Sequence, residues 1–100
     1  MAIEGTYKVE LTTTLGTENI ILTLDTFRDS LNGYMEGFFG QQSFVDGTID
    51  GNDISFSIEA DSPMGRLQID VTATIDGDNI AGQVQIGGFR PSQFQGARVQ

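Results

Sequence analysis

Apolar and polar residues alternate along most of this chain, and the alternation predicts β-strands. Ile54, Phe56 and Ile58 alternate with serines and an acid, and residues 67–75 continue in the same way. Successive side chains of a strand point to opposite faces, so this period of two indicates strands with one buried face and one solvated face. No segment keeps a helical period for long.

Turn-forming residues divide the chain into eight such strands. Asp50-Gly51 and Asp76-Gly77 are the strongest signals, because Asp-Gly favours a two-residue hairpin. The other breaks fall at 15–16, 28–29, 40–41, 64–65 and 87–88. The predicted strands are 5–12, 19–25, 30–37, 43–49, 54–60, 66–75, 79–86 and 92–99.

The chain also repeats itself. Sliding residues 4–47 (the first half) onto 53–96 (the second half) without a gap matches eight identical positions, where random pairing would give about three. The pairs are Glu10/Glu59, Gly16/Gly65, Ile20/Ile69, Thr23/Thr72, Asp29/Asp78, Gly33/Gly82, Ser43/Ser92 and Gly47/Gly96. Because closure hides strand edges, the expected fold is all-β: an eight-stranded antiparallel up-and-down barrel of two four-stranded halves. A two-sheet β-sandwich is the alternative.

Composition limits the function. The 100 residues predict one domain spanning 1–100, with 14 acidic side chains, five basic ones and a net charge of −9. Such an acidic surface repels phosphate backbones and anionic lipids, so neither nucleic-acid nor membrane binding is expected. No targeting signal or membrane-spanning apolar run is visible, which leaves the cytoplasm as the default expectation for its location.

The chain has no His and no Cys, so the usual general base, the thiolate nucleophile and the softer metal ligands are missing. The stretches 50–53 and 76–79 resemble calcium loops but lack the alternation of oxygen ligands and the distal Glu, and we interpret them as turns. We therefore expect no enzyme activity, cofactor or metal, and an enzyme working with carboxylates alone is the weakest hypothesis.

The two ends of the chain carry a resemblance to a known family. Gly5-Thr6-Tyr7 opens the first strand and Gly96-Ala97-Arg98 closes the last. This arrangement resembles the lipocalins and their calycin relatives, including the avidins, which open on Gly-x-Trp and end with an Arg packed across that aromatic. The resemblance implies that Tyr7 replaces the Trp and that Arg98 packs on it as a structural pair at the closed end of the barrel. The chain is also similar to small bacterial β-barrel domains of unassigned function, which occur alone or attached to larger enzymes.

The apolar face of each strand should point into the barrel. An eight-stranded barrel is only wide enough to be filled by side chains or to hold one small ligand, and the number of large residues favours a filled interior. Gly33, Gly82, Gly47 and Gly96 also point inward. The large inward positions are Tyr7, Val9, Leu11, Ile20, Leu22, Leu24, Leu31, Met35, Val45, Ile49, Ile54, Phe56, Ile58, Leu67, Ile69, Val71, Ile80, Val84, Ile86 and Phe94.

The up-and-down order predicts two unlike ends. One end gathers the tight acidic turns and both termini. The loops at the other end bring together apolar side chains and two arginines, as either a ligand mouth or a lid over the core. These candidates are Leu15, Phe38, Phe39, Met64, Arg66, Phe89 and Arg90.

The outer face differs between the halves. Ile21, Tyr34 and Phe44 point outward on consecutive strands, whereas their repeat mates are polar: Asp70, Gln83 and Gln93. An apolar stripe of this kind suggests an interface for a dimer or a protein partner. The alternative is a one-residue bulge that turns Phe44 inward.

Two functions remain open. The leading hypothesis is a non-catalytic interaction module that self-associates or docks on a protein partner through Ile21, Tyr34 and Phe44. The alternative is a carrier of a small apolar or carboxylate-bearing ligand, which would enter past the loop residues, with Arg66 or Arg90 meeting a carboxylate.

Overall fold

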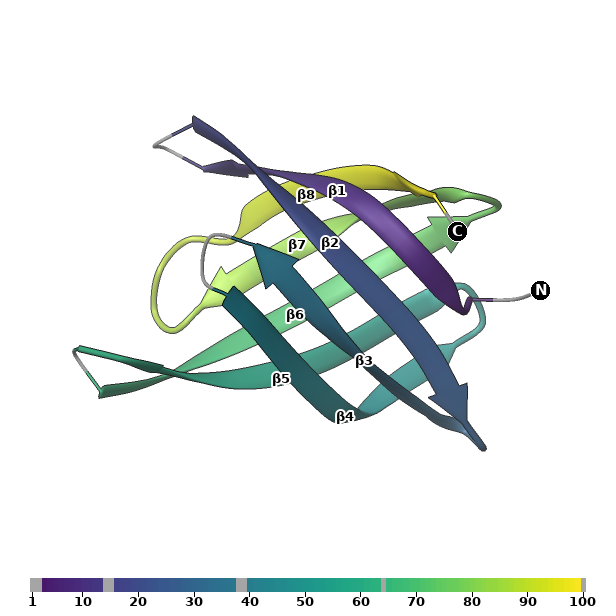
Figure 1. Cartoon of the computed structure of the whole chain (residues 1–100), viewed down its shortest axis with the longest axis horizontal. Helices are drawn as coiled ribbons and strands as arrows, with labels where there is room; N and C mark the ends of the chain where they lie inside the picture. The colour runs from purple at the N-terminus through teal and green to yellow at the C-terminus, as the bar shows by residue number, and fades with distance from the viewer. Residues whose placement is uncertain (1–2, 14–15, 38–39, 64, 100) are drawn as a thin grey trace.

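The computed structural model describes residues 3–13, 16–37, 40–63 and 65–99, with the backbone alone at 60–62. Eight strands close into a barrel in chain order, each antiparallel to the next (Figure 1). This confirms the predicted up-and-down barrel over the sandwich. The strands are β1 (Gly5–Thr13), β2 (Gly16–Phe27), β3 (Ser30–Gly37), β4 (Gly40–Asp50), β5 (Asp53–Ser62), β6 (Gly65–Asp76), β7 (Asn79–Ile86) and β8 (Ser92–Arg98).

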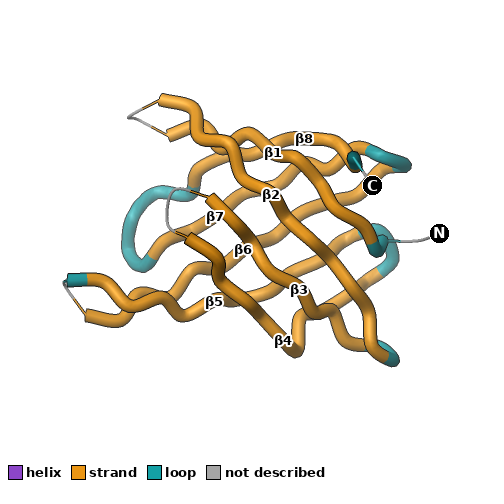
Figure 2. Tube along the Cα trace, viewed as in Figure 1, coloured by secondary structure: helices purple, strands orange, loops and turns teal. Residues whose placement is uncertain are grey.

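Three tight hairpins share one end of the barrel with both termini, and we call it the turn end (Figures 1 and 2). Their flanking pairs are Phe27/Ser30, Asp50/Asp53 and Asp76/Asn79. In each hairpin the first loop residue has a positive φ: 59° at Arg28 and 64° at Gly51 and Gly77. A positive φ at this position alone is typical of a type II′ turn, which matches the twist of the strands. The other ends of the strands lie at the opposite end of the barrel, which we call the loop end.

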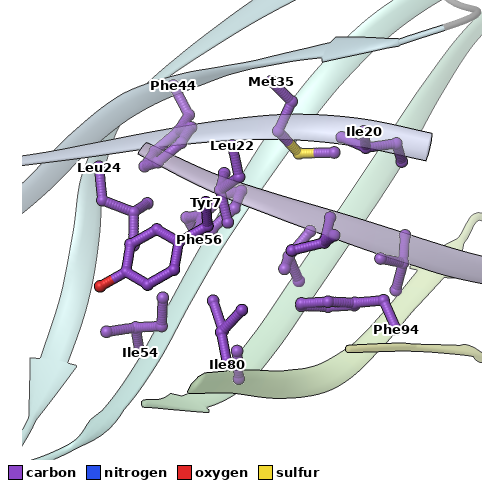
Figure 3. Packing of buried hydrophobic residues seen from close by; sticks show 14 of the residues in the cluster. Tyr7, Ile20, Leu22, Leu24, Met35, Phe44, Ile54, Phe56, Ile80 and Phe94 are labelled. Carbon is purple, nitrogen blue, oxygen red and sulfur yellow. The ribbon is translucent and has the colours of Figure 1, made fainter. Parts of the chain in front are cut away.

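Side chains fill the interior (Figure 3). The core contains Ile3, Tyr7, Val9, Leu11, Ile20, Leu22, Leu24, Leu31, Met35, Phe44, Ile54, Phe56, Ile58, Val71, Ala73, Ile75, Ile80, Val84 and Phe94, with Ile49, Ile69 and Ile86 packed against it. The interior space found among the described residues amounts to about 10 Å³, roughly the smallest space that holds one water.

Two inward glycines let neighbouring strands approach closely. Gly33 faces Phe44, and its repeat mate Gly82 faces Phe94. A Cβ at either position would lie 2.0 Å from a carbonyl oxygen of the neighbouring strand, that of Thr23 or Thr72. These positions therefore require glycine, and at Gly33 the Phe44 ring also lies close to where a side chain would begin.

A β-bulge in β4 corrects two predictions. Leu31 pairs with Gly47 but Gly33 pairs with Phe44, so β4 holds one more residue than β3 between these positions. Asp46 has a φ of 60°. Because a one-residue shift exchanges the two faces of a strand, Phe44 is buried (4% exposed) and Val45 lies outside (67% exposed). The outward, interface position predicted for Phe44 was wrong, and so was the inward position of Val45.

Candidate functional site

At the turn end, Arg98 packs on Tyr7 as the resemblance implies. Tyr7 is fully buried, and its hydroxyl donates a hydrogen bond to the Ile3 carbonyl at 2.7 Å. The Arg98 guanidinium lies 5.2 Å from the centre of the Tyr7 ring and donates to its hydroxyl at 2.7 Å. Arg98 also lies 3.7 Å from the Asp78 carboxylate, and its backbone N–H donates to the Asp78 carbonyl at 2.7 Å. These contacts join β8 to β1 and to the β6–β7 turn.

The structure describes only part of the predicted ligand mouth. Leu15, Phe38, Phe39 and Met64 lie outside the described residues. Arg66 is exposed on β6, and its guanidinium pairs with the Glu59 carboxylate of β5 at 3.1 Å. Phe89 and Arg90 are exposed on the loop between β7 and β8. The three described candidates therefore lie on two separate parts of the chain, the start of β6 and the β7–β8 loop.

The interior beneath these loops is apolar. The small remaining space there is bounded by Val9, Leu11, Ile20, Leu22, Met35, Val71, Val84 and Phe94. A water molecule needs two to four polar partners, and these side chains offer none beyond the weakly accepting Met sulfur. The lining is therefore apolar in character, but the space itself is far too small for a drug-sized ligand.

The pairing that closes the barrel is incomplete between β4 and β5. β4 and β5 form registered pairs only at Thr48/Ser55, Ile49/Ile54 and Asp50/Asp53. Within the described residues, no registered pair joins 40–47 of β4 to 56–62 of β5. We call the boundary between residues 40–47 and 56–62 the seam. The bulge explains it, because a bulge bends its strand and increases the local twist.

A groove follows the seam on the outer surface. One section of about 350 Å³ is lined by Ser43, Phe44, Val45, Ser57, Ile58 and Glu59. A second, of about 300 Å³, is lined by Val45, Asp46, Thr48, Ser55, Phe56, Ser57, Asp70, Val71 and Thr72. Behind the groove, the rings of Phe44 and Phe56 stack with centroids 3.7 Å apart and an interplanar angle of 7°. Side-chain stacking thus joins the two strands where backbone pairing ends.

The walls of the groove are acidic. Gln68 and Ser57 donate hydrogen bonds to one Asp70 carboxylate oxygen, at 2.9 Å and 2.6 Å, and these bonds hold the pKa of Asp70 below its usual value. Asp46 is exposed beside it, and Glu59 forms its ion pair with Arg66 at the surface. Since exposed ion pairs are weak, Glu59 stays accessible to another cation.

Two of the predicted interface residues keep their place on the outer face. Ile21 and Tyr34 are half-buried, and Tyr34 pairs across β3 and β4 with Ser43, which lines the groove. The bulge replaces Phe44 by Val45 as the third apolar side chain on this face. Sequence reasoning missed the β5 wall, whose outward residues are polar.

A further hollow lies on the outer face of the second half. It measures about 430 Å³ and is lined by Thr48, Asp50, Asp53, Ile54, Ser55, Thr72, Ala73, Thr74, Ala81 and Gly82. No group of three or more potential metal ligands occurs among the described residues. In the described part of the chain, no helix is long and apolar enough to cross a membrane.

No known protein family matches this sequence, and no curated protein matches it significantly. Two solved structures of designed proteins share its fold. The redesigned β-barrel mFAP1, solved bound to DFHBI, has a TM-score of 0.69 at 12% identity, covering 96% of this chain and 94% of its own. A de novo designed fluorescence-activating β-barrel has a TM-score of 0.69 at 11% identity, with coverages of 96% and 93%. At such identities the likeness establishes the eight-stranded barrel fold alone.

Proposed function

We propose that this chain is a non-catalytic interaction module that docks on a protein partner through the outer face of its first half and the adjoining groove along the seam. The observation that carries the proposal is the contrast between a filled interior, with about 10 Å³ free, and an outer groove of about 350 Å³. The described interior has no room for a ligand, so binding is favoured on the outer surface.

The apolar side chains on this face support the same function. Tyr34 is half-buried beside the groove, and Val45 on its wall is 67% exposed. Aromatic residues at the centre of an apolar patch supply much of the energy of protein interfaces, and acidic residues at the rim select partners by charge. At the repeat-equivalent position to Tyr34 the second half carries Gln83.

Site-specific photo-crosslinking tests this function. A photoreactive phenylalanine analogue at position 34 or 45 should give discrete protein adducts in producing cells, whereas the analogue at position 83 should not. Purified protein at high concentration distinguishes a second copy from another partner, because only self-association gives adducts there. The proposal fails if positions 34 and 45 give no adduct, or if position 83 gives the same adducts.

A second candidate is the binding of a small apolar ligand inside the loop end, which the apolar lining and the dye-bound designed barrel favour. The flexible Met35 side chain lines this space and fills part of the core around it. Met35→Ala should increase the binding of an environment-sensitive apolar dye, whereas Leu31→Ala, the fully buried matched control on the same strand, should not. Equal dye binding by the two variants contradicts this candidate.

A further inference from the structure

Along the seam the edges of β4 and β5 face each other without registered pairing. Residues 40–47 of β4 lie next to β3 and residues 56–62 of β5 lie next to β6, and in the described part of the chain no registered strand pairing occupies the seam side of either. The backbone N–H and C=O groups of such an edge form a template for one more strand.

The two edges are not equivalent. β4 is interrupted by the bulge, where Asp46 has a φ of 60°. β5 pairs with β6 in continuous register from Asp53 to Ser62. A regular edge accepts a new strand more readily than a bulged one, so β5 is the better template.

The charge around the seam limits what can bind there. Asp46, Glu59 and Asp70 carry negative charge on its walls, and a second copy of this chain would bring a further net charge of −9. Charged edges and bulges are common devices against pairing between identical chains. The seam thus disfavours its own copy and favours a cationic segment.

We propose that the seam accepts an extended strand of a partner protein, with basic side chains facing outward and apolar side chains facing inward. This inference rests on the proposed interaction function and names its partner. The strand pairs with β5 over 56–62, as in other cases of β-strand addition. Its inward side chains meet Phe44, Phe56 and Ile58, and its outward ones lie near Asp46, Glu59 and Asp70.

The test uses a capped seven-residue peptide that alternates Lys and Val, and its backbone N-methylated and Glu-Val analogues. Binding is followed by two-dimensional NMR of the full chain. The Lys-Val peptide should shift the amide signals of residues 56–59. N-methylation of alternate residues should weaken binding at least about tenfold, because it removes N–H donors to the β5 edge. The Glu-Val peptide should not bind.

The repeat supplies a matched control for electrostatics. Glu59→Lys and Glu10→Lys change the net charge equally, from −9 to −7, and exchange the same residue at equivalent positions of the two halves. Glu10 lies on β1, which pairs with β2 on one side and β8 on the other. Glu59→Lys should abolish binding, and Glu10→Lys should leave it nearly unchanged.

Each contrary result has its own meaning. Equal loss in the two Lys variants, or no binding of the Lys-Val peptide, overturns the strand proposal. Binding that survives N-methylation shows side-chain docking in the groove, which overturns strand addition and leaves the interaction function standing. Absence of crosslinks at positions 34 and 45 overturns the interaction function itself, whatever the peptides do.

Discussion

The stack of Phe44 on Phe56 should hold the seam closed, and a double-mutant cycle measures its contribution. Phe44→Leu, Phe56→Leu and the double variant remove the stack while keeping an apolar side chain at each position. Both rings are almost fully buried, at 4% and 5% exposure. Each single change removes three buried side-chain carbons and should cost about 2–3 kcal/mol, at roughly 0.8 kcal/mol for each buried carbon.

The coupling energy between the two positions is the informative quantity. Aromatic pairs contribute about 0.5–1.5 kcal/mol beyond their buried area, and they favour offset or edge-to-face geometry. Centroids 3.7 Å apart and nearly parallel planes leave the rings little offset. We therefore expect a coupling in the lower half of that range, about 0.5–1 kcal/mol.

Urea unfolding of the four proteins gives the cycle, provided that the slope of the transition stays constant. The control cycle pairs Phe44→Leu with Phe94→Leu, since these rings lie well apart (Figure 3). Distant sites should be additive within about 0.5 kcal/mol. The stack does not hold the seam closed if the Phe44–Phe56 coupling is no larger than that of the control cycle. The same conclusion follows if hydrogen exchange at residues 56–59 is unchanged in the double variant.

Three further predictions concern the rest of the barrel. Gly77→Ala should lower the free energy of unfolding by about 1–2 kcal/mol, because φ is +64° there. Gly88→Ala is the control: this position is open and has no positive φ, so the substitution should not lower the stability. Thermal melts of the two variants make the comparison. Tyr7→Phe should cost about 1–3 kcal/mol in urea unfolding, because the Ile3 carbonyl and the Arg98 guanidinium each lose a hydrogen bond to the hydroxyl; a loss below about 0.5 kcal/mol would contradict this. The Asp70 carboxyl has a lowered pKa in the folded state, so its contribution to stability is complete above its unfolded pKa and is lost as the pH falls through the folded one. Asp70→Asn should accordingly flatten the acid side of the stability profile, and parallel wild-type and variant curves would exclude that role.

Most of the fold was predictable, because alternation marks the strands and Asp-Gly marks the hairpins. The bulge was not, because Phe44 and Val45 are adjacent apolar residues and either can satisfy an inward position. The gapless repeat favoured Val45 as the inward residue, because it aligns Val45 with Phe94. In the structure Phe44 takes that place instead: it lies opposite Gly33, just as Phe94 lies opposite Gly82. One signal was present: Asp46-Gly47 is a turn-favouring pair inside a predicted strand, and such an isolated Gly often marks a bulge.

The seam could not be inferred for a related reason. A strand keeps its alternation whether or not a neighbour pairs with it, so Phe56 and Ile58 alternate with polar residues just as the apolar residues of the fully paired strands do. Ile21 and Tyr34 lie on the outer face as expected, because β2 and β3 pair without a bulge from Ile21/Glu36 to Phe27/Ser30. Alternation indicates which face of a strand points outward, but it does not indicate whether a partner binds to Ile21 and Tyr34.

The pairing of β1 with β8 also determines how freely the gene for this barrel can be rearranged. The first and last strands are hydrogen-bonded neighbours from Tyr7/Arg98 to Thr12/Gln93, and the Val99 N–H donates to the Thr6 carbonyl at 2.7 Å. A circular permutant that begins at Asn52, ends at Gly51 and joins the old termini through a short linker keeps every strand neighbour. Its new ends open at the β4–β5 turn, where only three registered pairs hold the two strands together. The two halves are thus exchangeable in order, and a coding sequence with them swapped should still specify this barrel.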